Sequence, residues 1–413
     1  MPRSPRYRMW PIARTLASRT AAAGWWGMVC AWLLIGAVLT GRSAAATAIS
    51  FDVEAEAALL LDAETGQILF AKNPDKQMPP ASIAKVMTML LVMEAVDAGR
   101  VSLEEPVPVS VHAYNMGGSQ VYLEPGEEFT VEEMFEAVAV GSANDASTAL
   151  AEHLAGTEGA FVDAMNRRAK ELGMTNTYFA NPHGLPSDPG EPESLTTARD
   201  IGIMARELIL RHPRVLEYTS IKERVFREEP LFILRNTNDL IWTYPGVDGL
   251  KTGHTDQAGW CLVATAERGR IRLISVVLNT ASREARDEQS TRLLDYGFNR
   301  FAVIDVAEAD EVVGEIRRRD AVPERFDVKV PEAAHVMVLR GREGTVSQIV
   351  EPLPDLTLPI EAGDRVGRLI VKSEDQELLT VDVVAAEDVH RANLFVRIWR
   401  AIRDFFANLF SRG

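Results

Sequence analysis

The segment "PPASIAKVMTMLLVM", residues 79–93, limits the possible folds of this chain more than any other feature. After the two prolines it predicts one helix that is apolar on every side, and such a helix is normally buried. Lys85 lies near its start and shares a face with Ser82, three residues earlier. Burying a cation costs free energy, so its presence needs a reason. The segment therefore predicts a central helix that carries a buried amine beside a serine.

Residues 1–48 have the composition of a secretory signal peptide. They contain six arginines and no acidic residue, an apolar run from Ala21 to Leu39, and then the small-residue run "SAAATA". This order predicts cleavage after Ala46 or Ala48. The alternative is an uncleaved membrane anchor, because the apolar run is almost long enough to cross a bilayer. We expect cleavage, and hence an exported protein.

Charge and cysteine content exclude several classes of function. Removing the six positive charges of residues 1–48 from the formal net charge of −15 leaves −21 on the mature chain. Such an acidic chain does not suit nucleic-acid binding, which needs a basic surface.

The mature chain is expected to have no internal disulfide and no metal site. Cys30 leaves with the signal peptide, so Cys261 is the one cysteine left in the mature sequence and has no partner for an internal disulfide. The seven histidines include no H-x-x-x-H pair, so we expect neither a metal nor another cofactor.

Residues 49–300 predict an α+β domain. The stretch "EAALLLDAETGQILFAKN" (56–73) is two apolar runs around a turn, which is typical of a β-hairpin. Helical periodicity dominates from Val131 to Leu210, and "GWCLVATAERGRIRLISVVL" (259–278) predicts a second hairpin. Strands, then helices, then strands favour one antiparallel sheet in which the terminal strands pair, with helices packed against it.

Two further segments follow this domain. Residues 301–389 contain short apolar runs separated by glycine, proline and charged residues, which predicts a small all-β domain. Residues 390–413 predict an amphipathic helix with apolar residues such as Phe395 and Trp399 on one face and arginines on the other. We expect this helix to lie in a membrane interface without crossing it. The alternative is a terminal helix that packs on its own domain.

Ser82 and Lys85 together could form an activated nucleophile. Ser82 lies in the first turn of its helix, where free backbone N–H groups and the helix dipole favour negative charge. An apolar environment should lower the pKa of the Lys85 amine, and a neutral amine can take the proton of a neighbouring hydroxyl. An isolated S-x-x-K pattern is weak evidence, because it is expected about once by chance in a chain of this length.

Two other elements strengthen this interpretation. "GSAND" places Ser142 and Asn144 at a junction between predicted helices, where polar side chains can reach a cleft. "VDGLKTGHT" places Lys251, Thr252 and Gly253 on a strand after a Pro-Gly turn. A lysine and a threonine can bind a substrate carboxylate by charge and hydrogen bonds, and the glycine allows a substrate to approach the strand closely. Taken singly, these residues could equally be a capping serine, a solvated lysine and a turn.

The three elements form a known signature. S-x-x-K, S-x-N and K-T-G occur here in the order found in penicillin-binding proteins and class A β-lactamases. The stretches "PPASIAKVMTMLL", "GSANDAS", "NPHGL", "VDGLKTGHTDQAG" and "RLISVVL" resemble those of the low-molecular-mass D-alanyl-D-alanine carboxypeptidases, peptidase family S11. So do the β domain and the C-terminal helix. The resemblance covers essentially the whole mature chain and implies a β-lactamase/transpeptidase-like catalytic domain.

The resemblance also implies catalytic roles. Ser82 would attack the carbonyl of the penultimate D-alanine of a peptidoglycan stem peptide, releasing the terminal D-alanine and leaving an acyl-enzyme. Lys85 would be the general base, and Ser142 would relay a proton to the leaving amine. Asn144 would hold the substrate amide and Lys85. Water would then hydrolyse the ester, and β-lactams, which mimic D-alanyl-D-alanine, would acylate Ser82 and leave slowly.

The same resemblance implies the substrate-binding residues. Lys251 and Thr252 would bind the terminal carboxylate of the stem peptide, on the strand that includes Gly253. The backbone N–H groups of Ser82 and His254 would form the oxyanion hole. The enzyme would act at the outer face of the cytoplasmic membrane, held there peripherally by the C-terminal helix.

Three alternative functions stay open at this point. A class A β-lactamase would need an E-x-x-L-N segment, but none lies between Asn144 and Lys251; Glu191 and Glu193 lack that context, and Ala143 replaces the usual aspartate. A non-catalytic peptidoglycan-binding protein is disfavoured because every catalytic position is filled. An endopeptidase or a transpeptidase would share the acyl-enzyme and differ only in the peptide and the acceptor.

Overall fold

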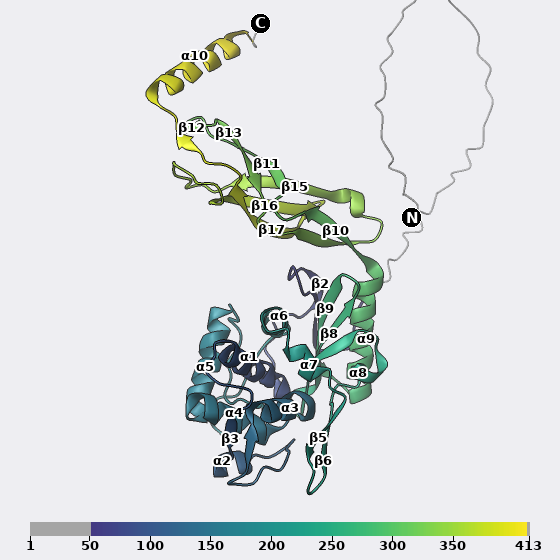
Figure 1. Ribbon diagram of the computed structural model, residues 1–413. Helices are drawn as coiled ribbons and strands as arrows, with labels where there is room; N and C mark the ends of the chain where they lie inside the picture. Colours follow the sequence, from purple (N-terminus) through teal and green to yellow (C-terminus); the bar gives the residue numbers. More distant parts are fainter. Residues whose placement is uncertain (1–50, 411–413) are drawn as a thin grey trace, which may run out of the picture. The chain divides into compact units, whose positions relative to one another are not determined.

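The computed structural model of this chain describes residues 51–410, with the backbone alone at residues 401 and 404–410 (Figure 1). The expected signal peptide, residues 1–48, lies outside the described residues.

The helices follow in chain order, with η marking short 3₁₀ helices. They are η1 (Ala81–Ala84), α1 (Lys85–Asp97), α2 (Val111–Tyr114), α3 (Val131–Gly141), α4 (Asn144–Ala155), α5 (Glu158–Glu171), α6 (Ala198–Arg211), α7 (Val215–Thr219), α8 (Leu240–Thr243), α9 (Arg283–Arg300), η2 (Glu343–Thr345) and α10 (Leu394–Phe410).

The strands fall into two groups, one before and one after α9. The first group is β1 (Ala57–Asp62), β2 (Ile68–Lys72), β3 (Pro106–Pro108), β4 (Glu128–Thr130), β5 (Glu223–Arg227), β6 (Phe232–Arg235), β7 (Val247–Thr255), β8 (Gly259–Arg268) and β9 (Ile271–Thr280). The second group is β10 (Phe301–Ala307), β11 (Val312–Arg317), β12 (Ala321–Val322), β13 (Arg325–Lys329), β14 (Ala334–Leu339), β15 (Val346–Pro352), β16 (Arg365–Ser373), β17 (Gln376–Ala385) and β18 (His390–Arg391).

A five-stranded antiparallel sheet organises the first group, in the order β2-β1-β9-β8-β7. Both predicted hairpins, β1–β2 and β8–β9, are present. Strand β1 also pairs with β9, so that Leu59 lies opposite Val276, and the expected pairing of the terminal strands is confirmed. The K-T-G residues lie on β7, at the edge of this sheet.

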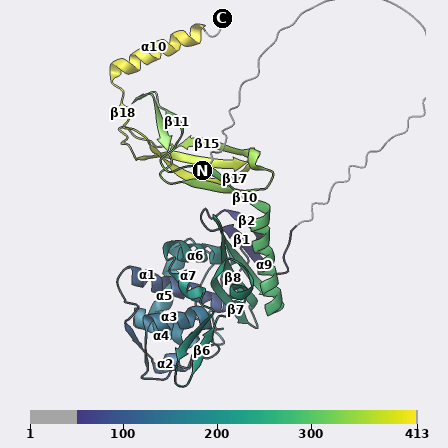
Figure 2. The same ribbon diagram turned by 45° about the vertical axis from the view of Figure 1, so that its right-hand side comes forward.

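The sheet separates two hydrophobic cores. Successive side chains of a strand point to opposite faces, so Leu59 and Leu61 of β1 join the larger core, which includes α1 and α6, whereas Leu60 joins the smaller core with α9. Figures 1 and 2 show α9 on one face of the sheet and α1 and α6 on the other. The β1 strand is accordingly buried along its whole length.

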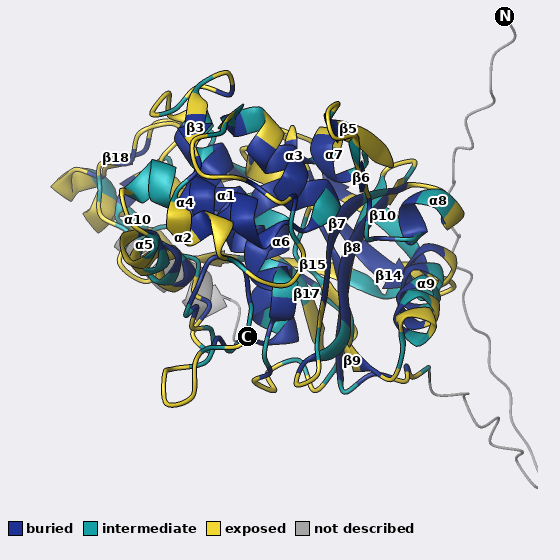
Figure 3. Cartoon of the chain, turned by 90° about the horizontal axis from the view of Figure 1, so that it is seen from below, coloured by how far each residue is buried: buried dark blue, intermediate teal, exposed yellow. Residues whose placement is uncertain are grey.

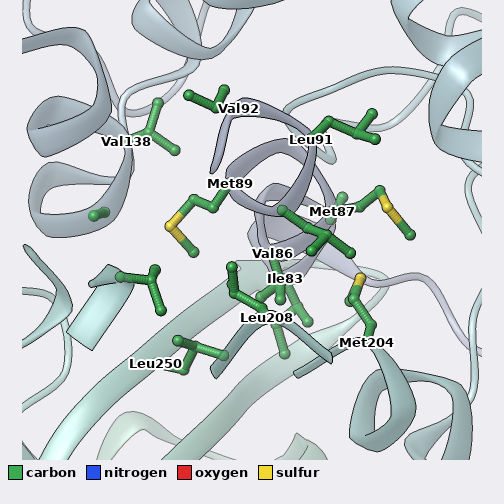
Figure 4. Close-up of a cluster of buried hydrophobic side chains, with 14 of the residues drawn as sticks. Ile83, Val86, Met87, Met89, Leu91, Val92, Val138, Met204, Leu208 and Leu250 are labelled. Carbon is green, nitrogen blue, oxygen red and sulfur yellow. The ribbon is translucent and has the colours of Figure 1, made fainter. Parts of the chain in front are cut away.

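Helix α1 lies inside the larger core, as its apolar pattern predicts. Every residue from Lys85 to Met93 is buried, and Figure 3 shows α1 in dark blue among α3, α4 and α6. In Figure 4, side chains leave this helix in several directions and meet Val138, Met204 and Leu250 of surrounding elements. Burying a large apolar side chain contributes about 1.5–3 kcal/mol. This packing holds the start of α1, and therefore Lys85, in one position.

The second group of strands forms the expected all-β domain. A five-stranded sheet runs in the order β11-β13-β17-β16-β15, and β10 pairs with β14. Phe326, Val366 and Leu369 are among the residues of a separate core. The predicted fold class, an α+β domain followed by a small all-β domain, is confirmed.

Helix α10 presents an apolar face to solvent. The side chains of Phe395 and Trp399 are 84% and 66% exposed. On the polar face, Arg400 donates a hydrogen bond to the carbonyl oxygen of Ala321 (2.6 Å) and forms an ion pair with Glu324 (3.4 Å). Among residues 51–410, none of the helices combines the length and the apolar composition of a membrane-spanning segment.

The loop that contains "NPHGL" passes very close to η1. Gly184 in this loop has φ +81°, and a Cβ at this position would lie 1.8 Å from the carbonyl oxygen of Ala81. Gly190, later in the same loop, has φ +99°, but among the described residues no atom lies within 4 Å of the equivalent Cβ position. The two glycines therefore differ in crowding and not in the sign of φ.

We predict that Gly184→Ala lowers the free energy of unfolding by about 3 kcal/mol or more, because it combines left-handed strain with a backbone clash. Gly190→Ala, which adds only the strain, should cost about 1–2 kcal/mol. Urea unfolding followed by circular dichroism measures both variants. Equal losses for the two would contradict this account of Gly184.

Candidate active site

Ser82 lies in a short and strained turn. It belongs to η1, directly before α1, and its neighbour Ala81 has φ 47°. This left-handed conformation costs a non-glycine residue about 1–3 kcal/mol and persists only where the surroundings hold it. Gly253 of β7 packs closely against this turn: a Cβ at this position would lie 3.0 Å from the carbonyl oxygen of Pro80. The glycine thus lets the edge strand pack directly against the turn that carries Ser82.

Lys85 is completely buried and has three polar neighbours. Its Nζ lies 3.0 Å from Ser82 Oγ, 2.6 Å from Asn144 Oδ1 and 2.7 Å from the carbonyl oxygen of His183. Burial, and secondly the charge of Lys251, lower the pKa of the Lys85 amine well below its usual value. The pKa shift expected from the sequence therefore has the expected sign and the expected main cause.

These contacts set the direction of the hydrogen bonds around the amine. A neutral amine has two N–H bonds and one lone pair. The side-chain oxygen of Asn144 and the carbonyl oxygen of His183 can only accept, so they take both N–H bonds. In the neutral form of Lys85 the lone pair is then available to the Ser82 hydroxyl, and this form can remove the proton of that hydroxyl.

Ser142 and Asn144 lie where α3 ends and α4 begins. Ser142 has φ 61°, a left-handed conformation, and its buried Oγ has no hydrogen-bond partner within residues 51–410. Asn144 Nδ2 donates to the carbonyl oxygen of Gly117 (2.6 Å). Asn144 therefore bridges Lys85 and the loop after α2, whereas the Ser142 hydroxyl is free for a ligand.

Strand β7 contributes a buried cation and a hydroxyl. Lys251 is 1% exposed, and its Nζ donates to the carbonyl oxygen of Thr252 (3.2 Å). Burial, and secondly the charge of Arg286, lower the pKa of Lys251 to about 7. Thr252 Oγ1 lies 2.7 Å from Thr237 Oγ1. This edge of the sheet can hold a carboxylate by charge and hydrogen bonds together.

These residues surround a cleft of about 510 Å³. Its lining consists of Ser82, Ser119, Ser142, Arg235, Asn236, Thr237, Thr252, Gly253, His254, Trp260, Arg283 and Arg286. Among these described residues none is acidic and three are arginines. The rings of His254 and Trp260 contact each other at a tilt of 31°, with 4.0 Å between their centroids. Arg283 and Arg286 are also paired with Asp239 and Asp287, but the described lining has no acidic side chain to repel an anionic ligand.

The structure brings all the sequence-predicted site residues together. Ser82, Ser142, Thr252, Gly253 and His254 line the cleft, Lys85 and Asn144 lie behind Ser82, and Lys251 is buried beside Thr252.

Other site residues were not predicted. The carbonyl oxygen of His183 contacts Lys85, and Arg286 of α9 lines the cleft, as do Ser119 and Thr237. His183 lies within "NPHGL", one of the stretches that resemble the family, but a backbone contact cannot be read from a residue type. Nothing in the sequence around Arg286 distinguishes it from the other arginines of α9.

Comparison with known proteins identifies the family. The profile of the D-alanyl-D-alanine carboxypeptidase family, Peptidase S11, matches residues 42–282, more than half of the chain. The chain belongs to this family. Membership confirms the expected activity class, a serine-type carboxypeptidase of peptidoglycan metabolism. The profile of the C-terminal domain of penicillin-binding protein 5 matches residues 301–391.

Individual relatives cover most of the chain. D-alanyl-D-alanine carboxypeptidase DacF of Bacillus subtilis is 38% identical over 355 residues, 85% of this chain and 90% of that protein. The crystal structure of penicillin-binding protein 5 from Haemophilus influenzae is 30% identical with a TM-score of 0.75, over 83% of this chain and 99% of that chain. Penicillin-binding protein D2 from Listeria monocytogenes, solved in an ampicillin-bound form, is 36% identical with a TM-score of 0.55, over 60% and 98%.

We predict that the buried Lys251 makes stability depend on pH. The pKa of this lysine is about 7 in the folded chain and 10.5 as an ordinary lysine, so between these values the unfolded chain binds more protons. Stability must then rise with pH across this window. The difference in unfolding free energy between wild type and Lys251→Met should rise by up to about 1.4 kcal/mol per pH unit.

Urea unfolding between about pH 7 and about pH 10 measures this slope. Lys222→Met, at an exposed lysine, is the matched control and should run parallel to wild type. Parallel curves for wild type and Lys251→Met would contradict the prediction.

Proposed function

We propose that Ser82 is the nucleophile with which this carboxypeptidase removes the terminal D-alanine from peptidoglycan stem peptides. The observation that carries the proposal is the 3.0 Å contact between Ser82 Oγ and the Nζ of Lys85, an amine whose pKa is lowered by burial. General-base assistance of this kind typically contributes about 10²–10⁴-fold in rate. A hydroxyl that lines a cleft and lies beside an amine with a lowered pKa has the chemistry of acyl transfer.

The reaction then proceeds in two steps, acylation of Ser82 and hydrolysis of the acyl-enzyme. Ser82 Oγ forms a bond to the carbonyl carbon of the penultimate D-alanine while its proton moves to Lys85. The tetrahedral intermediate collapses, the peptide C–N bond breaks, and the departing amine of D-alanine takes a proton relayed by the Ser142 hydroxyl. Water, deprotonated by Lys85, then attacks the ester and releases the shortened peptide.

The cleft supplies the binding contacts for this reaction. We propose that Thr252 and Arg286, which line the cleft, hold the terminal carboxylate together with Lys251, which is buried beside Thr252. The backbone N–H groups of Ser82 and His254 form the oxyanion hole, where each donor is worth about 3–4 kcal/mol in comparable sites. Asn144 keeps the base in place and faces the substrate amide.

Two observations favour this activity over its closest alternatives. A class A β-lactamase needs a glutamate beside the serine, and no acidic residue is among the described residues of the cleft; Glu193 instead accepts a hydrogen bond from Ser187 in its own loop. A D-alanyl-D-alanine endopeptidase of Pseudomonas aeruginosa is 32% identical over 57% of this chain, whereas the carboxypeptidase relatives match 84–87% of it. The match thus favours carboxypeptidase activity.

We further propose β-lactams as covalent inhibitors. The Listeria monocytogenes relative has been solved with ampicillin and with cefotaxime bound. A β-lactam would acylate Ser82 by the same first step as the peptide. Without a glutamate to activate water, the resulting ester would hydrolyse slowly.

We propose that the chain is divided by function into four segments. These are a signal peptide (1–48), a catalytic domain (49–300), an all-β domain (301–389) and a membrane-binding helix (390–413). Export followed by peripheral attachment would bring the cleft to the outer face of the cytoplasmic membrane, where peptidoglycan lies. The exposed apolar side chains of α10, Phe395 and Trp399, support this attachment.

Ser82→Ala should abolish the covalent penicillin adduct seen by intact-mass spectrometry and lower D-alanine release at least about a thousandfold. Ser347→Ala, at an exposed serine of the β domain, is the control and should keep both. A penicillin adduct on Ser82→Ala would exclude this serine as the nucleophile. Absence of an adduct and of D-alanine release in the wild type would favour a non-catalytic binding protein.

Truncation before Arg391 should release the protein from anionic lipid vesicles in a flotation assay. Phe395→Ser and Trp399→Ser should each weaken vesicle binding about tenfold or more, since each removes a large apolar side chain from the interface. Ile349→Ser, at an exposed apolar residue of β15, is the matched control. Unchanged flotation of the truncated protein would refute membrane binding by α10.

A further inference from the structure

Tyr122 is an exposed aromatic residue held in a strained conformation. It lies in the loop between α2 and β4, has φ 56° and is 64% exposed. A left-handed backbone is uncommon for a bulky residue and costs about 1–3 kcal/mol. An exposed side chain gains little from packing, so burial does not explain the strain. The surrounding contacts must hold Tyr122 in this position.

Two charged side chains supply those contacts. The carboxylate of Asp145, which is completely buried, accepts hydrogen bonds from the N–H groups of Val121 (3.0 Å) and Leu123 (3.2 Å). The guanidinium of Arg227, on β5, donates to the carbonyl oxygens of Val121 (3.2 Å) and Tyr122 (3.3 Å). The backbone around Tyr122 is therefore held from both sides, at the cost of burying a carboxylate.

The same loop forms part of the active-site cleft. Ser119 lines the cleft, and its carbonyl oxygen accepts a hydrogen bond from the backbone N–H of Asn144 (2.7 Å). The side chain of Asn144 also bonds the carbonyl oxygen of Gly117 (2.6 Å). Tyr122 thus lies three residues beyond a cleft residue, on a segment tied to the S-x-N element.

The β5–β6 hairpin extends this surface. The rings of Tyr122 and Phe232 meet edge to face with centroids 5.9 Å apart, and Leu231, the residue before Phe232, is 65% exposed. Strand β6 then runs from Phe232 to Arg235, which lines the cleft. We call Tyr122, Leu231 and Phe232 the apolar rim. Tyr122 lies three residues from Ser119 and Leu231 four residues from Arg235, so these exposed apolar side chains lie on two of the segments that line the cleft.

We propose that the apolar rim is a subsite for the sugar-bearing part of peptidoglycan, so that the enzyme prefers stem peptides still attached to a glycan. The inference rests on the proposed function, because it extends the same substrate. The anionic end of the peptide belongs with the cations of the cleft, and an uncharged aromatic surface offers it nothing. A sugar ring has an apolar face edged by hydroxyls, which suits an aromatic ring that is apolar in the middle and polar at its tip.

The test uses a pentapeptide ending in D-alanyl-D-alanine, with and without a linked N-acetylglucosaminyl–N-acetylmuramyl disaccharide. We expect Tyr122→Ala to lower kcat/KM for D-alanine release from the disaccharide-linked peptide about fivefold to tenfold, the effect of losing one aromatic anchor. The value for the free pentapeptide, and the rate of acylation by penicillin, should stay within about twofold of wild type. Tyr122→Phe, which keeps the ring, should keep most of the preference.

Tyr178→Ala is the matched control, because Tyr178 is 43% exposed and does not line the cleft. Equal losses on both substrates would overturn the proposal and make Tyr122 a support for the loop. Unchanged kinetics on both would also overturn it, whether the rim binds another partner or nothing. Failure of the proposed function has a different signature, in which wild type releases no D-alanine from either substrate and forms no penicillin adduct.

Discussion

For Lys85 to accept the proton of Ser82, water must be kept away from its amine. An ordinary lysine is protonated at neutral pH and cannot accept a proton. Here Lys85 is completely buried at the start of α1, and this burial disfavours the charged form of its amine. Asn144 and His183 then occupy the two N–H bonds and direct the lone pair. The hydrophobic packing of the core is thus also what determines the basicity of the lysine.

The cleft combines segments that are distant in the sequence but adjacent in the fold. The antiparallel sheet brings β7 to an edge, and Gly253 lets that edge touch the strained turn of Ser82. The junction of α3 and α4 contributes Ser142 and Asn144, because helix α3 ends in a left-handed residue at this point. Each of these features is a local backbone arrangement, and their close packing assembles the site.

The sequence predicted the elements whose signal lies in side-chain pattern or spacing. The all-apolar helix, both hairpins and the three motifs belong to this class, and so does the lowered pKa of Lys85. It did not predict contacts made by the backbone, such as the carbonyl oxygen of His183 or the left-handed Ala81, because residue type does not determine them. Arg286 was also missed, since its approach to the cleft depends on how α9 packs against the sheet.

The division of the first domain by its sheet has a consequence for mutational tolerance. Lys85, Asn144 and His183 all belong to segments on the side of α1, whereas Leu60, Leu293 and Leu294 pack on the side of α9. Substitutions deep in the smaller core should lower the amount of folded protein and can shift α9 with Arg286, but they leave the immediate surroundings of Lys85 unchanged. Substitutions around α1 alter the environment of the Lys85 amine itself. Far fewer substitutions should therefore be tolerated there than in the smaller core.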